Sequence, residues 1–224
     1  MDLFQITSTD TFQGPHQSLP PLETGALSSE AQLGMVMIHG RGASAQSILS
    51  LSGEIDARDK ITFIAPRAQG HTWYPYSFLA PTQKNQPGLN SGLQAVYNAV
   101  HQLVESGIPK DKIIILGFSQ GACLASEFAA RHPAKYGGII ALSGGVIGEK
   151  VEVESYSGDL KQTPYFVGCS DIDPHIPLER VEESARVFEH LNAKVEKRIY
   201  PGMGHTVNED EIAFLNDLIH SMID

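Results

Sequence analysis

The sequence predicts an α/β fold in which a mostly parallel central sheet carries helices on both faces. Short apolar runs that are typical of buried strands alternate with amphipathic helical patterns through at least five units. One such run, at residues 113–116, leads directly into a Gly-x-Ser-x-Gly motif at residues 117–121 and then into an alanine-rich stretch that Pro133 ends. Right-handed crossovers would place the carboxyl ends of the parallel strands at one edge of the sheet, where ligands bind in such folds.

Composition limits the classes of function. The chain has 224 residues, of which 42% are hydrophobic, and we expect residues 1–224 to form a single domain with a real core. The formal net charge of −10 argues against nucleic acid as a partner and against adsorption to anionic membranes. Cys123 and Cys169 match neither a zinc spacing nor a disulfide framework, and the first residues lack the basic segment of a signal peptide. We therefore expect a cytoplasmic protein without stable membrane association.

The individual elements follow in order along the chain. Strands are expected over residues 33–38, 61–65, 113–116, 138–142, 164–167 and 195–200. Helices are expected after a cap at Ser44 or Ser47, over residues 89–107 with Asn90 or Ser91 as the cap, over 122–131, and after residues 177 and 206. The charged, alternating residues 195–200 suit an edge strand. Residues 3–9 could form another short edge strand, and residues 15–29 are interpreted as a loop.

The Gly-x-Ser-x-Gly turn would expose one serine hydroxyl at the sheet edge. A very tight turn between a strand and a helix would hold Ser119 at its tip in a strained backbone conformation. Gly117 and Gly121 leave room there because neither carries a Cβ atom. The nearby helix N-terminus would favour a developing oxyanion. The alternative is an ordinary strand-to-helix turn with an incidental serine.

A second glycine-rich loop, at residues 39–44, follows the strand over residues 33–38. A phosphate-binding role is disfavoured because the loop has no Gly-Lys-Ser/Thr ending and no Gly-x-Gly-x-x-Gly pattern. An oxyanion role suits it better, with the Arg41 amide complementing the amide of Gln120; otherwise its glycines only permit tight packing. His39 is interpreted as a hydrogen-bonded structural histidine rather than a base.

A serine hydroxyl needs a base to act as a nucleophile, and that base needs a group to orient it. His205 is the one histidine that directly follows the last strand, and Asp171 and Asp173 follow the strand over residues 164–167, so the order along the chain is Ser, Asp, His. Five other histidines lie in the N-terminal loop or in helices and are interpreted as surface residues: His16, His101, His132, His190 and His220.

An aromatic segment at residues 67–88 has no clear periodicity. Long loops in compact domains are often functional, and His71, Trp73 and Tyr74 are candidates for a substrate pocket. The aromatic side chains could equally pin the loop to the core. An exposed apolar patch here would also suit a homodimer contact.

Four pieces of the sequence together resemble the phospholipase/carboxylesterase branch of the α/β-hydrolase superfamily, which includes the acyl-protein thioesterases. These pieces are Ile38-His39-Gly40-Arg41-Gly42, Gly117-Phe118-Ser119-Gln120-Gly121-Ala122, Asp173-Pro174-His175-Ile176-Pro177 and Gly204-His205. The resemblance implies an α/β-hydrolase fold, Ser119 as nucleophile, His205 as base, Asp173 as the orienting acid, and the Arg41 and Gln120 amides as the oxyanion hole. Asp173 is preferred to Asp171 because it keeps the four-residue step to Pro177. The segment around Trp73 differs from that of the animal thioesterases.

These observations predict a serine carboxylesterase for small-molecule esters of small or medium acyl chains, acting through an acyl-serine intermediate without a metal or organic cofactor. Three alternatives stay open: an acyl-protein thioesterase or lysophospholipase, a hydrolase of lactones or aromatic metabolites, and a non-catalytic binding protein on the same fold. Cys123 lies one helical turn past Ser119 and is interpreted as a core residue rather than a second nucleophile.

Overall fold

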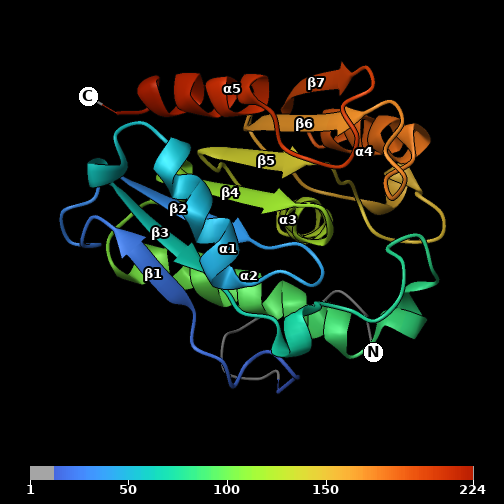
Figure 1. The fold of residues 1–224 in the computed structure, drawn as a ribbon, viewed down its shortest axis with the longest axis horizontal. Helices are drawn as coiled ribbons and strands as arrows, with labels where there is room; N and C mark the ends of the chain where they lie inside the picture. Colours follow the sequence, from blue (N-terminus) through green and yellow to red (C-terminus); the bar gives the residue numbers. More distant parts are fainter. Residues whose placement is uncertain (1–12, 224) are drawn as a thin grey trace.

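The computed structural model describes residues 13–223, which form a seven-stranded sheet flanked by helices (Figure 1). The sheet order is β1-β3-β2-β4-β5-β6-β7, and β1 is antiparallel to β3 while the other neighbours are parallel. The strands are β1 (Leu22–Gly25), β2 (Leu33–Ile38), β3 (Ile61–Ala65), β4 (Ile113–Phe118), β5 (Gly138–Leu142), β6 (Pro164–Ser170) and β7 (Lys194–Tyr200). The α-helices are α1 (Ala45–Leu49), α2 (Gly88–Glu105), α3 (Gln120–Arg131), α4 (Leu178–His190) and α5 (Glu209–His220). Short 3₁₀ helices span Ser50–Glu54, Arg58–Lys60, Gln69–His71, Thr82–Asn85, Lys110–Lys112 and Val153–Ser155. None of these helices is long and apolar enough to cross a bilayer.

The predicted α/β class is confirmed, and the two faces of the sheet explain the continuous apolar runs. Along β4, Ile113 and Ile115 pack in the core that includes side chains of α2, α3 and α4, whereas Ile114 and Leu116 pack in the core with α1 and α5. A strand covered on both faces must be apolar at every position, which is why β2 to β6 lack a polar alternation. The arrowheads of β2 to β7 point to one edge of the sheet (Figure 1).

The predictions for the two edges of the sheet have different outcomes. The edge position expected for residues 195–200 is confirmed, because β7 ends the sheet. The interpretation of residues 15–29 as a loop is wrong, since Leu22–Gly25 pairs antiparallel with the free edge of β3. Backbone pairing holds this short strand in place, and three of its four residues are exposed, so no apolar pattern reveals it. The edge strand expected over residues 3–9 lies outside the described residues.

Helices α1 and α2 differ in whether a side chain caps their N-terminus. Ser44 caps α1 as expected, with Ser47 completing a reciprocal capping box. By contrast, α2 begins at Gly88 with no side-chain cap, so the expectation of Asn90 or Ser91 is wrong. The hydroxyl of Ser91 instead accepts the His16 amide at 2.9 Å and so docks the N-terminal segment on the helix.

The surface interpretation of His16 is also wrong. This ring is only 3% exposed. Its Nδ1 accepts a hydrogen bond from the Gln69 amide at 3.0 Å, so Nε2 carries the proton and donates to the Trp73 carbonyl at 2.9 Å. Because both ring nitrogens find backbone partners, the histidine is buried without leaving a polar atom unpaired. Burial lowers its pKa, so it is neutral at physiological pH.

Helix α5 begins with a capping box that buries an acidic side chain. Asn208 accepts the Glu211 amide, and Oε2 of Glu211 accepts the Asn208 amide, both at 3.0 Å. Oε1 of Glu211 has no hydrogen-bond partner among the described residues, and a Cβ atom on Gly168 would lie only 2.0 Å from it. Burial, with a smaller contribution from the charge of Asp210, raises the pKa of Glu211 to about 7.

We expect this carboxyl group to make stability depend on pH. The folded-state pKa of about 7 exceeds the ordinary value of 4.5, so the folded protein keeps a proton that the unfolded chain loses between these values. Stability should therefore fall by up to about 1.4 kcal/mol per pH unit as pH rises through this range. Glu211→Gln keeps an acceptor for the Asn208 amide but does not titrate, and should remove this fall. Urea unfolding of both proteins from pH 4.5 to 8 measures the difference, and parallel stability profiles would contradict the expectation.

Candidate active site

Ser119 lies in a strained turn between β4 and α3, with φ of 56° and ψ of −120°. A Cβ atom on Gly117 would lie 2.2 Å from the Gly121 carbonyl oxygen, and one on Gly121 would lie 2.1 Å from the carbonyl oxygen of Ile38. Neither position has room for a side chain, as the sequence motif predicts. The Ser119 amide donates to the Leu142 carbonyl of β5 at 2.9 Å, which fixes the turn to the neighbouring strand.

The structure brings three of the predicted site residues into one hydrogen-bonded chain. Nε2 of His205 lies 2.8 Å from Oγ of Ser119, and Nδ1 of His205 lies 2.7 Å from Oδ2 of Asp173. The Asp173 carboxylate is fully buried while the His205 side chain is 18% exposed. With a proton on Nδ1, the ring donates to the carboxylate and its Nε2 is free to accept from the serine hydroxyl.

Asp173 is held as an anion by its surroundings. Its Oδ1 accepts hydrogen bonds from the amides of His175 at 2.8 Å and Ile176 at 3.0 Å. Burial acts to raise its pKa, but the hydrogen bonds from His205 and the two amides outweigh burial and leave the pKa below its ordinary value. Burial, followed by the Asp173 charge, raises the pKa of the adjacent Cys169 thiol to about 12, so that thiol stays protonated beside the carboxylate.

Asp171, which the sequence left as a competing acid, has a different partner. Its Oδ1 accepts the Gly202 amide at 2.8 Å, and the neighbouring Ser170 Oγ accepts the Gly204 amide at 3.1 Å. Both bonds fix the loop that carries His205, so Asp171 supports the histidine loop while Asp173 contacts the ring.

The loop after β2 lies directly against the serine. A Cβ atom on Gly40 would lie 3.3 Å from Cβ of Ser119, and Arg41 and Gln120 line the same cavity as Ser119. Gln120 is the first residue of α3, so its amide lies at the helix N-terminus, the positive end of the helix dipole. His39 accepts the Ala68 amide on Nε2 at 3.3 Å and donates from Nδ1 to the Gly40 carbonyl at 2.8 Å. Burial lowers its pKa, as suits the neutral structural histidine that the sequence predicts.

The cavity beside Ser119 has a volume of about 440 Å³. Its lining residues come from the loops after β2, β3 and β6, from the end of β4 and the first turn of α3, and from His205: Gly40, Arg41, Ala43, Tyr74, Pro75, Tyr76, Ser77, Phe78, Phe118, Ser119, Gln120, Cys123, His175, Ile176 and His205. Phe118 and Ile176 were not predicted from the sequence as pocket residues, although both lie inside motifs that resemble the family. Burial raises the pKa of the Cys123 thiol to about 12, so the sulfur in this wall is not a thiolate.

Of the three predicted pocket residues, only Tyr74 lines the cavity. The expectation for Trp73 is wrong because its ring is fully buried and its Nε1 donates to the His39 carbonyl at 2.8 Å. The expectation for His71 is also wrong, since its ring bonds the Ala43 carbonyl at 2.8 Å and its own carbonyl accepts the Gly42 amide at 2.7 Å. Both residues join the aromatic segment to the loop after β2, which is the pinning alternative that the sequence left open.

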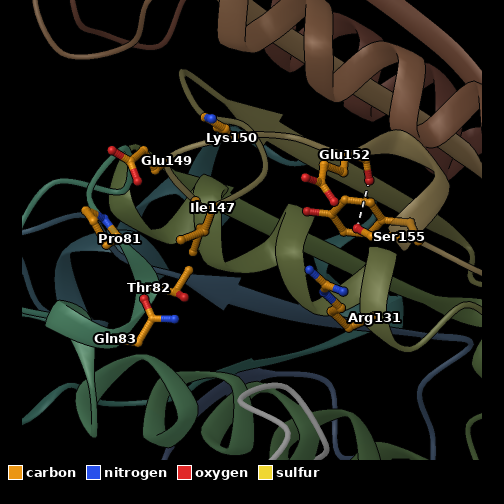
Figure 2. A pocket seen from close by; sticks show the side chains of 11 residues that line it. Pro81, Thr82, Gln83, Arg131, Ile147, Glu149, Lys150, Glu152 and Ser155 are labelled. Atoms are coloured by element: carbon orange, nitrogen blue, oxygen red, sulfur yellow. Dashed lines mark hydrogen bonds between the residues drawn. The ribbon is translucent and has the colours of Figure 1, made fainter.

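A second cavity, of about 230 Å³, lies between the 3₁₀ helix at Thr82–Asn85 and the segment after β5 (Figure 2). Arg131 borders it, forms an ion pair with the buried Glu127 at 2.8 Å and lies 4.2 Å from the Tyr156 ring centroid. Ser155 donates to the Glu152 carbonyl, and no histidine or cysteine lines this cavity. Thr82 and Ser155 supply hydroxyl groups there, but no histidine lies beside them as His205 lies beside Ser119.

Comparisons with known proteins identify the family of the chain. A family model described as Phospholipase/Carboxylesterase matches residues 23–223. The chain is similar to a phospholipase/carboxylesterase from Dyadobacter fermentans, with 44% identity and a TM-score of 0.86 over 90% of this chain and 96% of that one. It is 28% identical to acyl-protein thioesterase 1 of Debaryomyces hansenii over 91% of this chain and 98% of the relative. It is 25% identical to a probable carboxylesterase of Oryza sativa over 66% of this chain and 57% of the relative. The resemblance drawn from the motifs is confirmed: the chain belongs to the phospholipase/carboxylesterase family of α/β-hydrolases.

Proposed function

We propose that this hydrolase is a serine carboxylesterase that cleaves esters of small or medium acyl chains through an acyl-serine intermediate. The observation that carries the proposal is the pair of short hydrogen bonds that link Ser119 to His205 and His205 to Asp173 at the wall of one cavity. A nucleophile within reach of a base, and a base oriented by a buried carboxylate, is the arrangement that acyl transfer requires.

Each residue has a role in the proposed reaction. Ser119 Oγ attacks the acyl carbon while His205 Nε2 takes its proton, and Asp173 stabilises the resulting imidazolium. The amides of Arg41 and Gln120 hold the oxyanion of the tetrahedral intermediate. His205 returns the proton to the leaving alcohol, and water activated by the same ring then releases the acid. The cavity volume of about 440 Å³ lies in the lower part of the usual range for small-molecule sites, which favours short and medium acyl groups.

A thioesterase is the second candidate, because the relative from Debaryomyces hansenii is named an acyl-protein thioesterase and the same residues would serve both reactions. A lactone or aromatic-metabolite hydrolase would suit the aromatic wall formed by Tyr74, Phe78 and Phe118. We also propose a cytoplasmic location and a freely diffusing substrate, with neither nucleic acid nor a membrane as partner. The exposed Tyr76 at the mouth of the cavity would suit a homodimer contact.

Hydrolysis of a p-nitrophenyl ester series, from acetate to palmitate, tests the proposal directly. Wild-type turnover should peak at short or medium chains, and Ser119→Ala should lower kcat by about 10⁶-fold because it removes the nucleophile. A matched thioester series with the same acyl groups separates the two candidates. Activity that survives in Ser119→Ala would refute the serine mechanism, and a peak at the longest chains would replace small esters with lipids or acylated proteins.

The two aspartates of the loop after β6 should differ sharply in their effect on turnover. Asp173→Asn should lower kcat by about 10⁴-fold, because an amide cannot stabilise the imidazolium or hold the required tautomer. Asp171→Asn should retain nearly full activity, because its side-chain oxygen can still accept the Gly202 amide. Steady-state kinetics on the preferred ester measures both variants. Equal losses in the two would show that Asp173 has no special role at the histidine.

A further inference from the structure

Two loops at the mouth of the cavity are joined to each other at several points. We name residues 39–43, after β2, the oxyanion loop, and residues 71–78, after β3, the aromatic loop. The Gly42 amide donates to the His71 carbonyl at 2.7 Å, and Nε1 of Trp73 donates to the His39 carbonyl at 2.8 Å. The aromatic loop supplies Tyr74 and Phe78 to the cavity wall. A displacement of either loop would therefore be transmitted to the other.

The side chain of Arg41 makes the largest set of these contacts. Its Nη1 donates to the Pro75 carbonyl at 3.0 Å, and its Nη2 donates to the carbonyls of Tyr74 at 2.9 Å and Tyr76 at 2.7 Å. Three consecutive carbonyls of the aromatic loop thus converge on one guanidinium group. The planar fork of arginine donors suits such a set, whereas the single ammonium group of lysine can reach only part of it.

The other predicted oxyanion residue binds the same loop. Oε1 of Gln120 accepts the Trp73 amide at 3.0 Å, and its Nε2 donates to the Tyr74 carbonyl at 2.9 Å. The buried Asn85 also accepts the Tyr76 amide and donates to the Ser77 carbonyl, both at 2.9 Å. Two amides and several carbonyls of the aromatic loop are thus bonded to side chains rather than to a strand.

The backbone of Arg41 needs an external anchor. It lies between Gly40 and Gly42, and Gly42 has a φ of 75° in the left-handed region that glycine adopts freely. Glycine on both sides gives the intervening peptide groups conformational freedom, which the bond from the Gly42 amide to the His71 carbonyl restricts on one side. Stabilisation of an oxyanion depends on a donor held within a few tenths of an ångström of its position. The three bonds of the guanidinium supply a fixed reference for that donor.

We propose that Arg41 is a positioning and specificity-determining residue whose side chain fixes the aromatic wall to the amide that binds the oxyanion. Acyl-chain selection and the rate of acyl transfer then depend on the same side chain. This inference rests on the proposed function, because it takes the Arg41 amide as an oxyanion donor. It adds a role for the guanidinium group, which contacts the protein rather than the reacting atoms.

Kinetics of three variants test the role in turnover. Arg41→Ala should lower kcat by about 10- to 100-fold, less than the complete loss of an oxyanion donor, and should flatten the dependence on acyl chain length. Arg41→Lys should fall between this variant and the wild type, because one ammonium group can replace part of the contact. Arg186→Ala removes an exposed arginine of α4 and should leave both kcat and the chain-length profile unchanged. Wild-type kcat and profile in Arg41→Ala would overturn the proposal.

Hydrogen exchange of the wall gives a readout that does not depend on activity. The Trp73 and Tyr76 amides are bonded to side chains, so they exchange only when the aromatic loop opens. Mass spectrometry should find exchange about 10- to 100-fold faster in the peptide covering residues 72–79 of Arg41→Ala, with exchange in α2 unchanged as the internal reference. Lower kcat with unaltered exchange would overturn the proposal, because Arg41 would then act on the substrate directly. If the wild type hydrolyses no ester, the proposed function fails, and exchange alone decides whether Arg41 fixes the wall.

Discussion

The close approach of backbone to backbone at the turn after β4 is the constraint on which the site depends. In the parallel pairing of β2 with β4, Ile38 lies opposite Gly117, and the Ile38 carbonyl fills the space where Gly121 would carry a Cβ atom. This contact brings the end of β2 against the start of α3. The residues that follow each strand, His39 to Gly42 on one side and Ser119 on the other, are therefore neighbours before any side chain contributes. The strain of Ser119 is sustained because three elements meet at this turn.

The acid Asp173 and the base His205 reach Ser119 from the loops after β6 and β7, the last two strands of the sheet. The last paired residues of β6 and β7 are Ser170 and Tyr200, so the loops that follow them run side by side. Two hydrogen bonds join these loops ahead of His205 in the chain, from the Gly202 amide to Asp171 and from the Gly204 amide to Ser170. The bond between His205 and Asp173 adds a third link. Both glycines have positive φ, which lets the chain turn back over the sheet. The histidine loop is thus held by hydrogen bonds from its amides to the side chains of Ser170 and Asp171 rather than by a helix or strand of its own.

The sequence predicts those parts of the site that directly follow a recognisable strand. Ser119 and Asp173 each follow an apolar strand run, and His205 follows the charged, alternating residues 195–200. Parallel strands end at one edge of the sheet, so the proximity of the three residues could be predicted. The position of Trp73 could not, because an aromatic residue in an irregular segment suits a pocket wall and a core equally well. The position of Trp73 is decided by polar partners distant in sequence: the His39 carbonyl accepts from its indole, and the His16 ring donates to its carbonyl. Neither partner is marked by a periodic pattern in the sequence.

The aromatic loop is buried at Trp73, Tyr74 and Phe78, and this partial burial explains why the wall and the chemistry are connected. A loop without regular structure can be buried only if its amides and carbonyls find partners. In the aromatic loop these partners are mainly side chains, and two of them belong to the residues proposed as oxyanion donors, Arg41 and Gln120. The side chains that satisfy the wall thus extend from the backbone that would bind the oxyanion. A change in the shape of the wall would shift those amides unless the same polar partners remained, so acyl selectivity and turnover should vary together in this protein even when Ser119, His205 and Asp173 are unchanged.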